Sequence, residues 1–168
     1  MTFKRRPDPD KPAPPERSAY DKALGMLARR EHSRRELKAK LSQNGYAGAE
    51  ADAAIERLGE QHYQDDDRFA EMLLRSRIAR GYGPLRLRME LQSHGFADAH
   101  IRELLDAVDV DWAVCAANQL RRHYNGVGSA DRAERMRRAQ FLLRRGFAAA
   151  TVRSVTQADV DETADPES

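Results

Sequence analysis

The sequence has 168 residues, of which 33% are charged, 40% are hydrophobic and 7% are aromatic. This composition supplies enough apolar side chains for thin cores, but it argues against a thick β-sandwich core and against a large ligand cavity lined with rings. No stretch approaches the roughly 18 apolar residues of a membrane-spanning helix. The basic start of the chain is followed by prolines and charges, where a signal peptide would have its apolar segment. We therefore expect a cytoplasmic protein.

The formal net charge of +2 conceals a strong asymmetry along the chain. Residues 112–156 contain nine arginines and two acidic residues, a net charge of +7, whereas residues 157–168 contain five acidic residues and no basic one. A basic block of this kind favours an acidic partner, which is either nucleic acid or an acidic protein surface.

In chain order, residues 1–17 combine prolines with charges and are expected to form a disordered, basic arm. The pattern then becomes helical almost throughout, because alternating β-branched residues, the signature of strands, are missing. Leading helices are expected at Ser18–Arg30, Asp67–Arg80 and Asp111–Tyr124, each followed by a pair of further helices. Residues 158–168 form an acidic tail that we also expect to be disordered.

Several residues mark the ends of these helices. Ser33 is a candidate N-cap, and Glu36 three residues later completes a capping box. Pro84 occupies a position suited to the first turn of a helix. The residues expected to cap or charge other N-termini are Asp67, Asp98, Asp111 and Ser129.

A repeat is centred on three glycines that lie 50 and 51 residues apart. Each glycine follows a leucine by four positions and directly precedes an aromatic residue, which is typical of a helix ended by a glycine turn. The residues are Leu41, Leu91 and Leu142; Gly45, Gly95 and Gly146; and Tyr46, Phe96 and Phe147. We predict an all-α fold of three tandem three-helix repeats, helix-turn-helix-like and stacked into an elongated, curved array. The expected boundaries are residues 18–62, 63–110 and 111–157.

The sequence offers little support for catalysis or metal binding. The histidines His32, His62, His94, His100 and His123 show no ligand-like pairing, so solvated or capping roles are expected. The three consecutive Asp at 65–67 lack the glycine turn and distal glutamate of a calcium loop. The single Cys115 excludes an internal disulfide and is expected to be a small buried hydrophobe. Because phosphate loops and activated nucleophiles are also missing, we expect a non-enzymatic protein without metal or cofactor.

Arginines gather in two places, which favours a contact surface over a merely solvated helix face. One cluster, comprising Arg75, Arg77, Arg80, Arg86 and Arg88, brackets residues 81–84. The other, in the third repeat, comprises Arg132, Arg135, Arg137, Arg138, Arg144 and Arg145. Each helix–glycine turn–helix also resembles a DNA-binding helix-turn-helix, but the acidic start of the helix at 49–54 argues against base reading by the first repeat.

Four segments in this order, on a three-fold repeat, resemble the RecX family of recombination regulators. They are LARREHSRRELKAKL at 27–41, DDDRFAE at 65–71, RGYGPLRLRMEL at 80–91 and QFLLRRGF at 140–147. The resemblance covers roughly residues 20–156. Gln64 departs from it, because the family has an apolar residue there, and this predicts looser packing at that turn.

The resemblance implies a non-enzymatic regulator of the RecA recombinase, in DNA recombination, DNA repair and the SOS response. Such a protein binds RecA, lies in the groove of its filament on single-stranded DNA and inhibits ATP hydrolysis, strand exchange and co-protease activity. Direct binding to single- or double-stranded DNA, as in a helix-turn-helix protein, and a helical-repeat adaptor with another partner are the alternatives. Expected contact residues are Arg77, Arg80, Arg86, Arg88, Arg135, Arg138, Arg144 and Arg145. Expected structural residues are Gly45, Gly95, Gly146, Tyr46, Phe96, Phe147 and Phe69.

Overall fold

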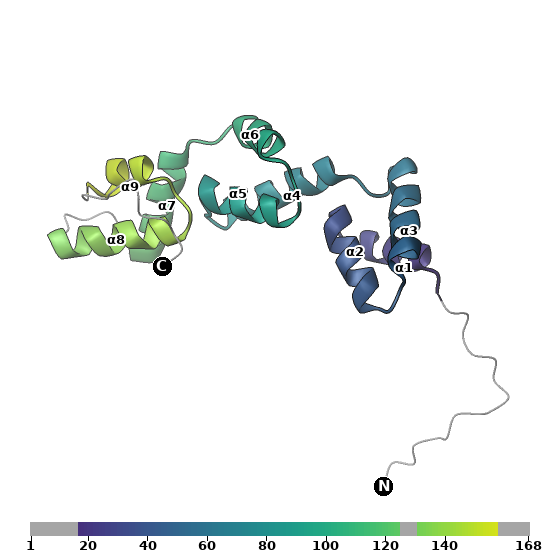
Figure 1. Cartoon of the computed structure of the whole chain (residues 1–168). Coiled ribbons are helices and arrows are strands. Elements are labelled where there is room, and N and C mark those ends of the chain that lie inside the picture. The colour runs from purple at the N-terminus through teal and green to yellow at the C-terminus, as the bar shows by residue number, and fades with distance from the viewer. Residues whose placement is uncertain (1–16, 125–130, 158–168) are drawn as a thin grey trace, which may run out of the picture.

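The computed structural model describes residues 17–124 and 131–157, and within these ranges the chain forms helices and turns without a strand (Figure 1). The predicted all-α fold is confirmed. In chain order the helices are α1 (Ala19–Leu27), α2 (Arg34–Gln43), α3 (Gly48–Glu60), α4 (Asp66–Ala79), α5 (Pro84–Ser93), α6 (Asp98–Asp106), α7 (Trp112–Tyr124), α8 (Arg132–Arg144) and α9 (Ala149–Thr156). We call α1–α3 unit 1, α4–α6 unit 2 and α7–α9 unit 3.

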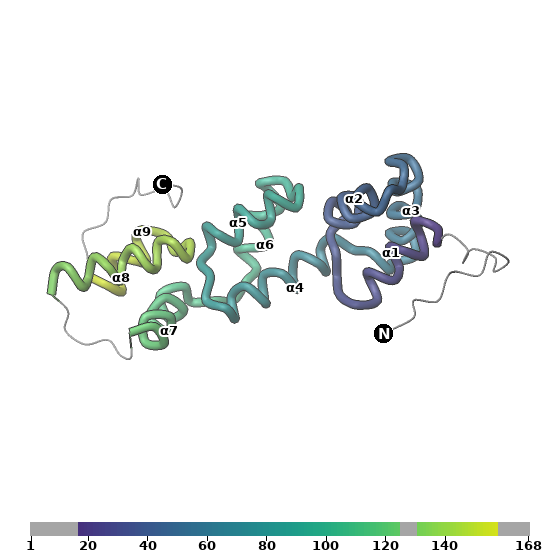
Figure 2. The backbone as a smooth tube through the Cα atoms, turned by 90° about the horizontal axis from the view of Figure 1, so that it is seen from below, coloured from purple at the N-terminus to yellow at the C-terminus, as the bar shows by residue number. Residues whose placement is uncertain are grey.

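Each unit encloses its own small core. Leu41, Leu91 and Leu142, the leucines before the repeated glycines, are fully buried, one in each core. Trp112 at the start of α7 packs against the cores of both unit 2 and unit 3. Because the cores are separate, the units follow one another as an elongated chain, with unit 1 and unit 3 at opposite ends (Figures 1 and 2).

The repeated glycine turns share one geometry. At the end of α2 the amide of Gly45 donates to the carbonyl of Ser42 (2.9 Å), and the amide of Tyr46 donates to the carbonyl of Leu41 (3.2 Å). This is a Schellman motif, which requires a left-handed residue at the glycine position. Gly45, Gly95 and Gly146 have φ angles of 88°, 89° and 82°, as the repeat predicts.

The aromatic residues of the turns close the cores from one end. Phe147 is fully buried in unit 3, whereas Tyr46 and Phe96 are partly buried and pack against the cores of units 1 and 2. Phe69 of α4 is also buried, with 2% of its surface exposed.

The structure contains two further turns of this type that the sequence analysis did not identify. Gly81, after α4, has a φ of 80°, and the amide of Tyr82 donates to the carbonyl of Arg77 (3.1 Å). His62, after α3, takes the same left-handed conformation with a φ of 58°, although it carries a side chain.

The expected helix caps are confirmed where the structure describes them. The hydroxyl of Ser33 accepts the amide of Glu36 (3.1 Å), and Pro84 is the first residue of α5. Asp67 and Asp98 lie in the first turns of α4 and α6. Asp111 accepts the amides of Ala113 (2.9 Å) and Val114 (3.1 Å).

Some predicted helix ends were wrong. The helix expected at 18–30 ends at Leu27, because the chain must turn and extend before Ser33 can cap the next helix. The carboxylate of Asp131 caps α8 by accepting the amide of Glu134 (2.7 Å). Ser129, the residue expected to do so, lies outside the described residues.

Candidate functional site

Unit 2 and unit 3 meet through their backbones. The amide of Gly83 donates to the carbonyl of Arg145 (2.8 Å), and the amide of Leu85 donates to that of Gly146 (3.0 Å). A Cβ atom on Gly83 would stand 2.4 Å from the carbonyl oxygen of Gly146, and one on Gly146 would stand 2.5 Å from the backbone nitrogen of Arg86. These clashes exclude side chains at both glycines. We call this contact the second joint.

Arg145 holds the second joint with its side chain as well. Its Nη1 donates to the carbonyl of Arg80 (2.9 Å), one of the exposed carbonyls at the C-terminus of α4. Its guanidinium lies over the rings of Tyr82 (5.4 Å to the centroid) and Phe141 (5.1 Å). Although Arg145 was predicted to contact a partner, the structure therefore gives it a role inside the molecule.

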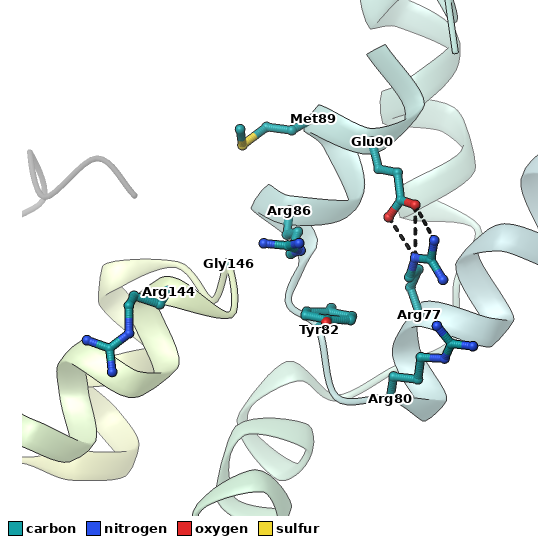
Figure 3. A pocket seen from close by; sticks show the side chains of 8 residues that line it. All are labelled: Arg77, Arg80, Tyr82, Arg86, Met89, Glu90, Arg144 and Gly146. Carbon is teal, nitrogen blue, oxygen red and sulfur yellow. Dashed lines mark hydrogen bonds and ion pairs between the residues drawn. The ribbon is translucent and has the colours of Figure 1, made fainter. Parts of the chain in front are cut away.

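The second joint leaves a hollow of about 520 Å³ on the surface (Figure 3). We call it the arginine groove; its lining residues are Arg77, Arg80, Tyr82, Arg86, Met89, Glu90, Arg144 and Gly146. Arg80 extends from the end of α4, and Arg144 extends from α8 on the opposite side (Figure 3). The groove therefore unites predicted contact residues from both arginine clusters.

One arginine of the groove is neutralised within the protein. Nε of Arg77 lies 2.8 Å and 2.9 Å from the two carboxylate oxygens of Glu90, and Nη2 lies 2.5 Å from Oε1 (Figure 3). This hydrogen-bonded pair lowers the pKa of Glu90 and raises that of Arg77. Because the pair ties α4 to α5, Arg77 contributes to the structure of unit 2.

The other arginines of the groove keep their charge uncompensated. Among the described residues, no carboxylate lies within 4 Å of the guanidinium nitrogens of Arg80, Arg86 or Arg144. All three residues are exposed, and Arg86 rests over the ring of Tyr82, 4.7 Å from its centroid. The groove therefore presents positive charge beside an aromatic ring.

The remaining predicted contact residues lie outside the groove. Arg138 of α8 is only 12% exposed at its side chain; it pairs with Glu134 (3.1 Å) and lies over the ring of Tyr124. Arg135 is half-buried on the same helix, and Arg88 is half-buried on α5. The prediction for these three stays untested.

Two more hollows continue from the groove along the molecule. One of about 340 Å³ shares Arg77, Arg80 and Glu90 with it and extends to Arg30 in unit 1. Another of about 490 Å³ begins at Arg30 and is lined by further basic residues, which are Arg17, Lys22, Arg29 and Lys40. Hollows that contain basic residues thus occur in all three units, although Arg30 and Arg77 of the middle one are paired with Glu36 and Glu90. These unit 1 residues were not predicted as contact residues, although residues 17–40 contain eight basic and three acidic residues, a signal that could have indicated them.

Unit 1 meets unit 2 through side chains instead. The fully buried Ser33 lies with its Oγ 2.9 Å from Nδ1 of His94, whose ring packs against Phe69 at 4.6 Å between centroids. Nε2 of Gln64 donates to Asp66 (2.8 Å) and to the carbonyl of His32 (3.3 Å). We call this contact the first joint. The looser packing predicted at Gln64 was wrong, since only 4% of the residue is exposed and its side chain is hydrogen-bonded.

The expectation that the histidines are solvated or capping was wrong for His32, which is 5% exposed. Its Nδ1 lies 3.1 Å from the carboxylate of Glu36 but lacks the alignment of a hydrogen bond. Burial lowers the pKa of His32, although Glu36 opposes the shift. Burial also lowers the pKa of His94, which sits at the C-cap of α5 as a capping role would require.

Within the described parts of the chain, His, Cys, Asp and Glu side chains do not gather in threes as a metal site would need, and no helix is long and apolar enough to cross a bilayer. Cys115 is half-buried against the core of unit 3, and burial raises the pKa of its thiol. This agrees with the small apolar residue expected and disfavours a reactive thiolate.

Comparison with known proteins gives matches in each unit. The model of the first three-helix domain of RecX matches residues 19–58, that of the second matches 65–105, and that of the third matches 114–156. Together these matches cover most of the chain in the order expected for the family.

Relatives that resemble nearly the whole chain carry the name Regulatory protein RecX. The protein from Stenotrophomonas maltophilia (strain K279a) is 42% identical over 149 residues, covering 89% of this chain and 91% of the relative. That from Halorhodospira halophila is 44% identical over 147 residues, covering 87% and 91%. That from Xanthomonas axonopodis pv. citri is 39% identical over 161 residues, covering 92% and 99%.

The fold is similar to that of a solved structure as well. The crystal structure of RecX from Lactobacillus salivarius matches with a TM-score of 0.67 at 22% identity, covering 83% of this chain and 92% of the other. Because the sequence identity is only 22%, this similarity supports the arrangement of the helices and nothing more. On the domain matches and the close relatives together, the chain belongs to the RecX family of regulatory proteins.

Proposed function

We propose that this protein is a non-enzymatic regulator that binds the RecA recombinase. It lies along the groove of the RecA filament on single-stranded DNA and thereby inhibits ATP hydrolysis, strand exchange and co-protease activity. The family membership supports the regulatory role, and the observation that carries the binding proposal is that hollows containing basic residues occur in all three units.

An elongated chain of small units suits a filament as a partner. A filament repeats the same surface at each protomer, so contacts made by separate units add without any single contact being strong. The uncompensated charges of Arg80, Arg86 and Arg144 are suited to acidic protein surfaces or to phosphates. Contacts of this kind weaken as salt is added, because ions screen them.

The test measures ATP hydrolysis by the cognate RecA on excess single-stranded DNA, titrated with this protein. The groove variant carries Arg80→Gln and Arg144→Gln, because both side chains are exposed and Arg86 is too close to the second joint to be changed cleanly. The matched control carries Arg122→Gln and Arg132→Gln, two exposed arginines of unit 3 outside the groove.

We expect inhibition well below the amount needed to coat the DNA, weakened in the groove variant and retained in the control. Equal inhibition by both variants would reject the groove as the contact surface. Inhibition that starts only when the protein saturates the DNA would instead favour direct DNA binding. The absence of inhibition by the unmodified protein would overturn the proposal.

A further inference from the structure

The uncompensated charge of the arginine groove has a complement in the same chain. Residues 158–168 contain five carboxylates, those of Asp159, Asp161, Glu162, Asp165 and Glu167, and no basic residue. The groove presents the guanidinium groups of Arg80, Arg86 and Arg144, which have no carboxylate partner among the described residues. We propose that residues 158–168 dock in the arginine groove of their own molecule.

The tail is long enough to reach the groove. The α8–α9 turn at Gly146 lines it, and α9 runs from there for eight residues, a length of about 12 Å. Gln157 ends the helix in a left-handed conformation with a φ of 55°. Eleven extended residues span up to about 36 Å, so residues in the middle of the tail can return along α9 to Arg144 and cross to Arg86.

Other basic residues of unit 3 are less available to the tail. Arg137 and Arg138 share the carboxylate of Glu134, and Arg145 is held by the carbonyl of Arg80. Arg122 and Arg132 are exposed on α7 and α8 and do not line the groove. Among the hollows of the described residues named above, the groove is the one that brings together uncompensated guanidinium groups from two units. Several carboxylates can therefore be paired there at once.

Docking within one chain needs no strong individual contact. Because the tail is covalently attached, its effective concentration near the site is on the order of millimolar. The docked tail is displaced by salt and by a more acidic partner. If the groove binds the partner as proposed above, on which this consequence rests, the tail covers that surface until the partner displaces it.

The test places a nitroxide spin label at Thr163→Cys in full-length protein carrying Cys115→Ala, and follows amide signals of glycines by NMR. We expect the signals of Gly81, Gly83 and Gly146 at the groove to lose most of their intensity, while that of Gly48 in unit 1 keeps it. The loss should disappear in the Arg80→Gln/Arg144→Gln variant and at high salt, and persist in the Arg122→Gln/Arg132→Gln control.

Equal losses of signal intensity in the groove variant and the control would mean that the label is near these glycines only because the tail is attached to α9. That result would overturn the proposal. Losses transferred to an unlabelled copy in a mixture would show docking between molecules and overturn it as well. A separate measurement compares RecA inhibition by the full chain and by residues 1–157. The truncated chain should inhibit at lower concentration. Equal inhibition would reject the covering role, whereas failure of both chains would reject the proposed function and leave the NMR result to decide the docking.

Discussion

Gly83 and Gly146 face each other across the second joint so closely that a Cβ atom on Gly83 would stand 2.4 Å from the carbonyl oxygen of Gly146. Gly83 has a φ of −88°, which any residue can adopt, so glycine is required there by the space alone. The joint between units 2 and 3 therefore depends on a missing side chain.

This contact predicts the effect of Gly83→Ala. The added methyl group must push the two turns apart or strain them, and overpacking of this kind costs about 1–3 kcal/mol. The free energy of unfolding, measured by urea denaturation and circular dichroism, should fall by that amount. Gly48→Ala is the control, because nothing lies within 4 Å of a Cβ atom there. Similar changes in the free energy of unfolding of both variants would mean that the second joint accommodates the methyl group without a loss of stability.

The first joint should respond to pH. The hydroxyl of Ser33, which accepts the amide of Glu36, also lies 2.9 Å from Nδ1 of His94. A neutral ring can accept the hydroxyl proton at this contact, whereas a protonated ring cannot. Burial holds the pKa of His94 below 6.5, while the carboxylates of Glu36, Glu90 and Asp66 oppose that shift and Arg30 adds to it. Because the unfolded chain binds this proton more tightly, stability is complete above about pH 6.5 and is lost as the pH falls toward the lowered pKa.

His94→Asn tests this dependence, because an amide oxygen can accept from Ser33 but does not titrate. The free energy of unfolding, measured from pH 7.5 to 5, should fall less steeply with pH in the variant than in the unmodified protein. The difference in slope should be at most that of one bound proton, about 1.4 kcal/mol per pH unit. His32 supplies a dependence of the same sign, which remains. An unchanged slope in His94→Asn would contradict the prediction.

His62 offers a stabilising substitution. It holds a left-handed conformation while the amide of Tyr63 donates to the carbonyl of Leu58 (2.9 Å), the bond that glycine supports elsewhere in the molecule. A side chain in this region costs roughly 1 kcal/mol, so His62→Gly should raise the free energy of unfolding by somewhat less. Gln140→Gly, at an exposed position inside α8, is the control and should lower it by up to about 1 kcal/mol. A loss of stability in His62→Gly would show that its side chain does more than fill the turn.

The fold could be predicted because its determinants are local. A leucine, a glycine four residues later and an aromatic residue after it, as at Leu41, Gly45 and Tyr46, contain all the atoms of one Schellman turn. Their recurrence defined three units before any contact between units was known. The turn at His62 escaped notice because a residue with a side chain stands where the pattern has glycine.

The candidate site could be predicted only in part, because a charge in the sequence does not reveal its partner. Arg77 and Glu90 are 13 residues apart and meet only when α4 and α5 pack together. Ser33 and His94 are 61 residues apart, and nothing local to either marks the first joint. Arg80 and Arg144 share a groove because the turns of two units touch.

Because Trp112 lies between two cores, its fluorescence can report partial unfolding of the protein. It is the single tryptophan of the sequence, and it packs against units 2 and 3 but not against the core of unit 1. Its fluorescence therefore follows those two units alone, whereas circular dichroism follows helices in all three. A difference between the midpoints of the two denaturation curves measures how independently unit 1 unfolds. The measurement needs neither a substitution nor an added dye.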